Sequence, residues 1–395
     1  MNLKLVGANV VIMIGIVAFA DLPSNREQPS SSYQESTTRS GASRPGAGPV
    51  LEMTSRSFGS GRVIPGADGG GYGGCPQLLS STPGSGLIAG VDVVGNLAYQ
   101  AAWASGLRII SLDDPSSPTE IGAFDTPGYS RSVTVDGTFA YVADRDNGLR
   151  IIDVTDPTTP FEAGFYDTDG VTNWVAIERD GPVTYAYLAD GPNGLLVLDV
   201  SVPTNISAIG SQPTLHWADG VVLANDHAFV ADRSGGLRII DVMNPNAPTE
   251  VGVVETWPYE TNAVVVRGDY AYLAVGEAGD GGLIVVDASD PDHPTVISTF
   301  VGIDEALGIA VSDDGYVFLS DQEKLWIIDV SVPAAPFVVG VYDWPNLAGG
   351  ELAGVDVEGG LVVEASERAA RMNVFDRVSC PFFSDGVESG DTSDW

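Results

Sequence analysis

Short apolar segments separated by turn residues run through most of this chain. In residues 132–168 they read SVTVDG, FAYVADRDNG, LRIIDVTDP and PFEAGFYDT. The segments are rich in β-branched and aromatic residues, which favour strands. Asp136-Gly137 indicates a tight hairpin after the first segment, and Asp156-Pro157 ends the third. The pattern therefore predicts a unit of four short β-strands.

This unit recurs at a nearly constant period. The intervals between successive third strands are 42, 46, 42, 46 and 42 residues, and a degraded seventh copy ends at Asp376, 47 residues beyond Asp329. A period in this range is typical of solenoids and propellers. The residues that precede the third strand and mark the period are Gly106, Gly148, Gly194, Gly236, Gly282 and Lys324.

The third strand of each unit is apolar on both faces, as in residues 149–154. A sheet with one face in water would alternate, so both faces of these strands must be covered. Four-stranded units packed face to face around an axis achieve this. The helical periodicity that a TIM barrel or a Rossmann fold requires is absent. We therefore predict an all-β fold, a seven-bladed β-propeller of four-stranded blades.

The seventh unit has no fourth strand of its own after Asp376. Residues 76–84, PQLLSSTPG, align with residues 118–128, PTEIGAFDTPG, when a two-residue gap is allowed. We expect this N-terminal segment to be the outer strand of blade seven. Pairing of the two ends would close the ring and remove its exposed edges.

The recurring pattern G-L-x-I-I-D-V-x-x-P, with a preceding A-Y-V-A-D, resembles the LVIVD-repeat family over residues 76–376. Drift such as Ser201-Val202-Pro203 departs from the motif, yet six of the seven copies keep most of it. The resemblance implies a β-propeller in a secreted or cell-surface protein of bacteria or archaea. It transfers no catalytic residue.

The two cysteines flank the point where the ring should close. Cys75 directly precedes the N-terminal outer strand, and Cys380 follows Asp376 by four residues. We predict a disulfide between them, in the place where a peptide connection stands in the other units. In the entropic model such a bridge stabilises by about 4–5 kcal/mol. Two unrelated free thiols are the alternative.

The two ends of the chain differ in composition from the repeats. Residues 1–20 combine Lys4 with an apolar run ending in Ala18-Phe19-Ala20, the layout of a cleaved signal peptide; an uncleaved anchor is the alternative. Residues 21–74 are rich in Ser, Gly and Pro and predict a disordered linker. Residues 75–381 form the predicted propeller. Residues 382–395 form an acidic tail, either a sorting tag or a disordered end.

The charge balance restricts the class of partner. The chain has 53 acidic and 18 basic residues, a net charge of −35. Such a surface repels phosphate backbones and anionic headgroups, so we expect no nucleic-acid or membrane-surface partner. It suits solubility, cationic partners or Ca²⁺. We predict a secreted or cell-surface monomer with no transmembrane segment after signal cleavage.

The antiparallel strand order sorts the loops onto two faces. The face with the second-to-third and unit-to-unit loops is richer in polar and aromatic residues, and we call it the loop-rich face. In each blade, one residue just before the innermost strand should lie at the channel mouth, so that seven such residues surround it. Three of them are apolar, namely Ala89, Leu307 and Ala353. We predict a ligand site at its polar members, although Arg131 and Asp219 satisfying each other is the alternative. The polar members are Arg131, Asn173, Asp219 and Asn262.

Aromatic residues beside carboxylates and amides also occur in the unit-to-unit loops of this face. Such a surface suits a sugar or a peptide. Packing between blades is the alternative for each tryptophan. The predicted loop-face residues are Trp174, Trp217, Trp257, Tyr259, Glu260 and Trp344.

A weak cation signal lies in one second-to-third loop. Asp144, Asp146 and Asn147 resemble part of a Ca²⁺ loop, which needs six to eight oxygen ligands. The loop lacks a bidentate acid, and Asx-rich turns form for local reasons as well. Calcium is therefore the only cofactor that the sequence suggests.

Two functional classes remain. The favoured one is a non-catalytic scaffold that binds an extracellular protein or glycan through the loop-rich face. The alternative is an extracellular lyase or hydrolase with its active site at the channel mouth, where the register places only Asp219 as an acid. The three histidines lack partners at metal spacing, and nucleophile elbows, P-loops and dinucleotide fingerprints are absent.

Overall fold

The computed structural model describes residues 50–52, 77–84, 86–277, 280–303, 305–321, 324–343, 352–366 and 371–377. These residues fall within one compact unit and form strands and turns without a helix, so none of them makes a helix able to span a bilayer. The predictions for residues 1–20, Cys75, Trp344, Cys380 and residues 382–395 lie outside this part of the chain. Of the predicted linker it describes residues 50–52 alone.

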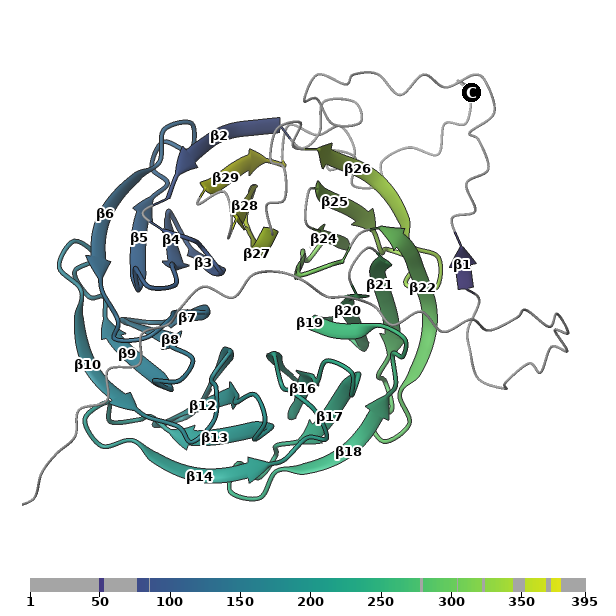
Figure 1. Ribbon diagram of the computed structural model, residues 1–395, viewed down its shortest axis with the longest axis horizontal. Helices are drawn as coiled ribbons and strands as arrows, with labels where there is room; N and C mark the ends of the chain where they lie inside the picture. Colours follow the sequence, from purple (N-terminus) through teal and green to yellow (C-terminus); the bar gives the residue numbers. More distant parts are fainter. Residues whose placement is uncertain are drawn as a thin grey trace, which may run out of the picture. The chain divides into compact units, whose positions relative to one another are not determined.

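Seven antiparallel sheets of four strands are arranged as blades around a central axis (Figure 1). We number the blades by their innermost strands. In order from blade 1 to blade 7, these are β3 (Gly90–Val94), β7 (Ser132–Asp136), β11 (Trp174–Asp180), β15 (Gly220–Ala224), β19 (Glu260–Arg267), β23 (Gly308–Val311) and β27 (Leu352–Glu358). The second strands are β4 (Leu97–Ala101), β8 (Phe139–Ala143), β12 (Val183–Ala189), β16 (His227–Ala231), β20 (Tyr270–Glu277), β24 (Tyr316–Ser320) and β28 (Leu361–Ser366).

The third and outer strands complete each blade in the same order. The third strands are β5 (Leu107–Ser111), β9 (Leu149–Asp153), β13 (Leu195–Asp199), β17 (Leu237–Asp241), β21 (Asp280–Asp287), β25 (Lys324–Asp329) and β29 (Arg371–Asp376). The outer strands are β6 (Thr119–Phe124), β10 (Phe161–Tyr166), β14 (Ser207–Gln212), β18 (Thr249–Val254), β22 (Thr295–Ile303), β26 (Phe337–Asp343) and β2 (Gln77–Pro83). In addition, β1 (Val50–Glu52) pairs in parallel with the free edge of β22.

The ring closes between the two ends of the described chain. Strand β2 pairs antiparallel with β29, with Gln77 opposite Asp376 and Pro83 opposite Arg371. Each innermost strand contacts the innermost strand of the next blade, including β27 with β3. The predicted seven-bladed propeller, with an N-terminal outer strand in blade 7, is therefore confirmed.

Seven apolar clusters fill the spaces between neighbouring blades, one at each junction. In β9, Leu149 and Ile151 pack with residues of blade 3, whereas Ile152 packs with residues of blade 1. Burial of both faces explains why the third strand is apolar throughout rather than alternating. The core of this protein is thus a series of interfaces around the channel.

The glycine of the outer strands fits against the next blade. A Cβ at Gly164 would lie 1.8 Å from the carbonyl oxygen of Pro203, and one at Gly122 would lie 1.9 Å from that of Pro157. The repeated glycine of one blade therefore packs against the repeated turn proline of the next blade. In β2 the equivalent residue is Ser80, and its hydroxyl donates a hydrogen bond of 2.8 Å to the carbonyl of Pro115.

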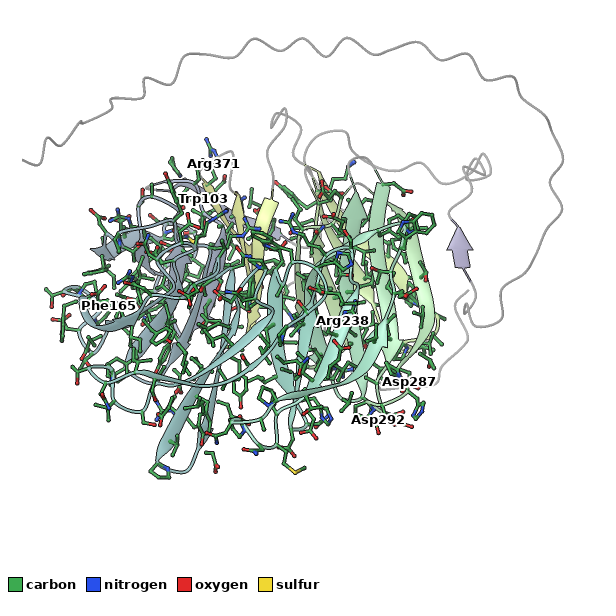
Figure 2. The ribbon with its side chains drawn as sticks, turned by 60° about the horizontal axis from the view of Figure 1, so that its bottom comes forward. Trp103, Phe165, Arg238, Asp287, Asp292 and Arg371 are labelled. Atoms are coloured by element: carbon green, nitrogen blue, oxygen red, sulfur yellow. The ribbon has the colours of Figure 1, made fainter. Side chains whose placement is uncertain are left out.

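The two faces of the ring are distinct, as predicted. Trp103, in the β4–β5 loop, lies at one end of the molecule, whereas Asp292, in the β21–β22 turn, lies at the other (Figure 2). The loop-rich face carries the β4–β5 type of loop together with the loops between blades. The opposite face carries the Asp-Pro turns.

Candidate functional site at the channel mouth

A cavity of about 270 Å³ lies at the channel mouth on the loop-rich face. Its walls come from six consecutive blades, blade 1 to blade 6, because the beginnings of the innermost strands converge there. The residues that line it are Ala89, Arg131, Trp174, Asp219, Arg233, Glu260, Asn262, Ala263, Glu305 and Leu307. We call it the mouth cavity.

The structure brings most of the predicted ring together around this cavity. Arg131, Asp219 and Asn262 line it, as do the apolar positions Ala89 and Leu307. Asn173 does not, because it is only 2% exposed and its amide is used inside the protein. The side chain of Ala353 lies outside the described residues.

Asp219 is held by a network that crosses from blade 3 to blade 4. Its Oδ2 accepts a hydrogen bond of 2.5 Å from Nε of Arg233, and its Oδ1 accepts one of 3.1 Å from Nδ2 of Asn173. Burial works against the charge of Arg233, but Asp219, Glu260 and Glu305 outweigh it and raise the pKa of the guanidinium. Asp219 and Arg233 therefore form a fixed ion pair in the cavity wall.

The loop that carries Arg233 is itself held rigidly. Arg233 has a φ of 41°, in the left-handed region, and its backbone forms a bridge with Thr261 of blade 5. Ser234 donates a hydrogen bond of 3.1 Å to Oε1 of Glu260. Nδ2 of Asn262 donates one of 2.8 Å to the carbonyl of Ala306 in blade 6. These contacts join neighbouring blades around the mouth.

Arg131 differs from the other charged residues of the cavity. In the described part of the chain its guanidinium forms no ion pair and donates no hydrogen bond. The alternative in which Arg131 and Asp219 satisfy each other is therefore wrong, because Arg233 and Asn173 occupy both oxygens of Asp219. Arg131 thus contributes an unpaired positive charge to the cavity wall.

The predicted loop-face aromatics have different environments. Trp174 lines the mouth cavity and also packs against the apolar cluster between blades 3 and 4. Trp257 is 83% exposed. Tyr259 packs against the cluster between blades 4 and 5, and its hydroxyl donates a hydrogen bond of 3.3 Å to Asp280. Trp217 is partly buried beside Gly191.

Of the five predicted loop-face residues that the structure describes, only Trp174 and Glu260 line the mouth cavity. The exposed Trp257 lies in the β18–β19 loop of the same face.

The residues of the predicted calcium loop have different surroundings. Asp144 is fully buried, and its carboxylate accepts hydrogen bonds from the Thr126 hydroxyl at 2.6 Å and the Gly128 amide at 2.8 Å. Burial raises the pKa of Asp144, although both donors oppose this. Asp146 is exposed. Among the described residues, no three His, Cys, Asp or Glu side chains are placed to hold a metal.

Equivalent aspartates in the next two blades have the same structural role. Asp190 accepts hydrogen bonds from the hydroxyls of Thr168 and Thr172, each 2.8 Å long. Asp232 accepts one of 2.6 Å from Thr214. The recurring Ala-Asp at the end of the second strand thus anchors the loop that arrives from the preceding blade. These loops lead into the innermost strands, so the aspartates position the mouth residues.

Sequence reasoning missed Arg233 and Glu305 as cavity residues. The predicted ring considered a single position per blade, whereas these two side chains reach the mouth from neighbouring loops. Arg233 lies in the same type of loop as Asp144, and its spacing of 14 residues from Asp219 crosses one hairpin. A search for basic residues across that hairpin would have found it.

Comparisons with known proteins agree with this architecture. A family model described as "LVIVD repeat" matches residues 85–126, 127–168, 184–214, 217–256, 260–301 and 305–344, which together exceed half of the chain. No curated protein matches the chain. The crystal structure of the computationally designed Ika8 protein is similar with a TM-score of 0.51 and 10% identity, over 73% of this chain and 83% of that one. At this identity the likeness concerns the fold alone.

Proposed function

Since this chain belongs to the LVIVD repeat family and carries a polar cavity at the mouth of its ring, we propose that it is a non-catalytic scaffold that binds a partner through the loop-rich face. The partner is an extracellular protein or glycan, and the predicted signal peptide supports export of the chain. A group of the partner enters the mouth cavity, and the surrounding loops contact the rest.

The observation that carries this proposal is the composition of the mouth cavity. It combines an unpaired cation, an ion pair, two further carboxylates and an indole ring, contributed by strand ends and by the loops beside them. Convergent polar groups on a rigid concave surface are typical of ligand sites. The opposite face offers the repeated Asp-Pro turns, whose polar groups are largely used within the turns themselves.

Catalysis is the second candidate, because the cavity contains three acids, whereas the sequence predicted only Asp219 at the channel mouth. Glu260 and Glu305 line it together with Asp219. Glycoside hydrolysis uses two carboxyl groups that exchange protons with the substrate or attack it. Asp219 is bound to Arg233 and Asn173, and Oε1 of Glu260 accepts a hydrogen bond from Ser234; this arrangement favours binding over turnover.

A binding screen with variants of both faces tests the proposal. The full chain would be applied to a glycan and peptide panel, with and without Ca²⁺. Leu307→Trp would fill the mouth cavity, and Met243→Trp would add the same bulk at a 74% exposed position on the opposite face. Ligands should be retained by Met243→Trp and lost by Leu307→Trp. Absence of any ligand, or the reverse response of the variants, would overturn the proposal, and turnover of a bound glycan would favour the enzyme.

A further inference from the structure

The charge environment of Arg131 identifies the kind of group that the mouth cavity accepts. Every other arginine in the described part of the chain has a partner: a carboxylate, a backbone carbonyl or an aromatic ring. These arginines are Arg108, Arg145, Arg150, Arg179, Arg233, Arg238, Arg267, Arg371 and Arg377. In a protein with 53 acids and 18 bases, an arginine without a partner is the exception. Arg131 is therefore available to pair with an anion of the ligand.

The other charges of the cavity limit how negative that anion can be. Asp219 is neutralised by Arg233, and Glu260 and Glu305 add two further carboxylates on the side of blades 5 and 6, where they also act on the charge of Arg233. A phosphate or sulfate diester chain would bring strongly charged groups toward these carboxylates. A single carboxylate directed at Arg131, in blade 2, can avoid them. The cavity therefore favours a ligand with one carboxylate and uncharged polar groups elsewhere.

The remaining cavity groups fit a sugar ring. The indole of Trp174 offers an apolar surface, while Glu260 and Glu305 can accept hydrogen bonds from hydroxyls and Arg233 can donate them. The volume of about 270 Å³ is just below the range of roughly 300–1,000 Å³ typical of drug-sized ligands. One ring fits such a space, with the neighbouring residues of a chain passing over the loops.

Resting on the binding function proposed above, we propose that the mouth cavity binds one uronic acid residue of an extracellular polysaccharide whose neighbouring sugars are uncharged. Arg131 pairs with the sugar carboxylate, and Trp174 packs against the apolar face of the ring. Glu260 and Glu305 accept hydrogen bonds from hydroxyls on the opposite side. A peptide carboxylate would satisfy Arg131 as well, but a sugar ring also presents several hydroxyl donors to Glu260 and Glu305 and an apolar face to Trp174.

Calorimetric titration of the full chain with a glucuronate probe, an otherwise neutral xylo-oligosaccharide that carries one glucuronate residue, tests this assignment. The neutral probe is the methyl ester of the same oligosaccharide, which keeps the rings and their hydroxyls but lacks the charge. We expect the acid to bind and the ester to bind at least tenfold more weakly, since the ester loses the charge-assisted hydrogen bond to Arg131.

Three arginine variants locate the effect. Arg131→Gln should weaken binding of the glucuronate probe about 10- to 100-fold, and Arg131→Lys should restore part of the affinity by restoring the charge. Arg145→Gln is the matched control, because Arg145 lies over the Trp103 ring on the same face and does not line the cavity. It should leave the affinity unchanged.

Equal affinity for acid and ester, or an unchanged affinity in Arg131→Gln, would overturn the proposal. Binding of an acidic peptide in place of the uronate, with the same dependence on Arg131, would overturn it in favour of a protein partner. In both cases a ligand lost in Leu307→Trp would leave the binding function standing. If no ligand responds to Leu307→Trp, both proposals fail.

Discussion

The outer strand of one blade packs against a turn of the next blade in two different ways. One is found at the four junctions from blade 1 to blade 5, and the other at the junction between blades 7 and 1. In the regular junctions, a glycine lies directly under the carbonyl of the proline in the turn that follows the third strand of the next blade, as Gly164 does under Pro203. In the closing junction, Ser80 occupies that position and its hydroxyl bonds to the Pro115 carbonyl. The difference shows that a segment from the far end of the chain can complete the ring without copying the repeat.

A buried acid in a regular blade and one in the closing blade also differ in their hydrogen-bond partners. Asp190, in blade 3, accepts hydrogen bonds from two threonine hydroxyls and an asparagine amide. Glu364, in blade 7, is fully buried and bonds to Asn373 alone, and its Oε1 has no partner among the described residues. Burial raises the pKa of Glu364 from 4.5 to about 8. Asp190 is thus held by three neutral donors, whereas Glu364 in the closing blade favours its protonated form.

The largest expected loss of stability follows from a substitution at the glycine of an outer strand. Gly164→Ala would place a Cβ 1.8 Å from a backbone oxygen, and relief requires a shift between blades 2 and 3. We expect a loss of about 3 kcal/mol of unfolding free energy, measured by chemical denaturation. Gly220→Ala is the control, because its Cβ would have no neighbour closer than 3.6 Å. Equal losses in the two variants would contradict this account of the repeat.

A smaller, pH-dependent effect should arise in blade 7. Because the folded-state pKa of Glu364 is raised, folding stability is greatest below pH 4.5 and falls as the pH rises toward about 8. One pKa unit corresponds to about 1.4 kcal/mol. Glu364→Gln, which keeps an acceptor for Asn373, should therefore be more stable than the wild-type protein by a few kcal/mol at pH 8.5 and nearly equal to it at pH 5.

Denaturation curves of both proteins at these two pH values provide the measurement. A gain of the same size at pH 5 and pH 8.5 would assign the effect to packing rather than to ionisation of Glu364.

The smallest effect is expected at Ser80. Ser80→Ala removes the hydrogen bond to Pro115 but leaves the Cβ that this junction already accommodates. The expected loss is about 1 kcal/mol, well below that of Gly164→Ala in the same denaturation experiment. A loss as large as that of Gly164→Ala would show that the closing junction is as tightly packed as the regular ones.

The fold was largely predictable because the same pattern, four short strands with a third strand that is apolar on both faces, recurs in every repeat. The period, the two-sided third strand and the missing fourth strand of blade 7 together determined the ring and its closing strand. The glycine contact with the Asp-Pro turn was not predictable, because it joins residues of different blades whose spacing in space is absent from the sequence pattern. The exchange of Gly for Ser at residue 80 escaped notice for the same reason.

The candidate site was predictable in position and less so in composition. A register argument placed Arg131, Asp219 and Asn262 at the mouth, where the structure also has them. It also placed Asn173 there, although that side chain is buried and serves Asp219. Which loop side chains reach the cavity depends on loop conformation, as the left-handed backbone of Arg233 illustrates. Strand periodicity carries no information on that point.

The central claim is that β2 closes the ring by pairing with β29. Hydrogen–deuterium exchange of the full chain, followed by mass spectrometry of peptides covering residues 77–83 and 371–376, tests it directly. We predict that the β2 amides are protected to the same degree as those of β6 and β10, the outer strands of blades 1 and 2. Exchange of residues 77–83 at the rate of an unstructured segment would contradict ring closure.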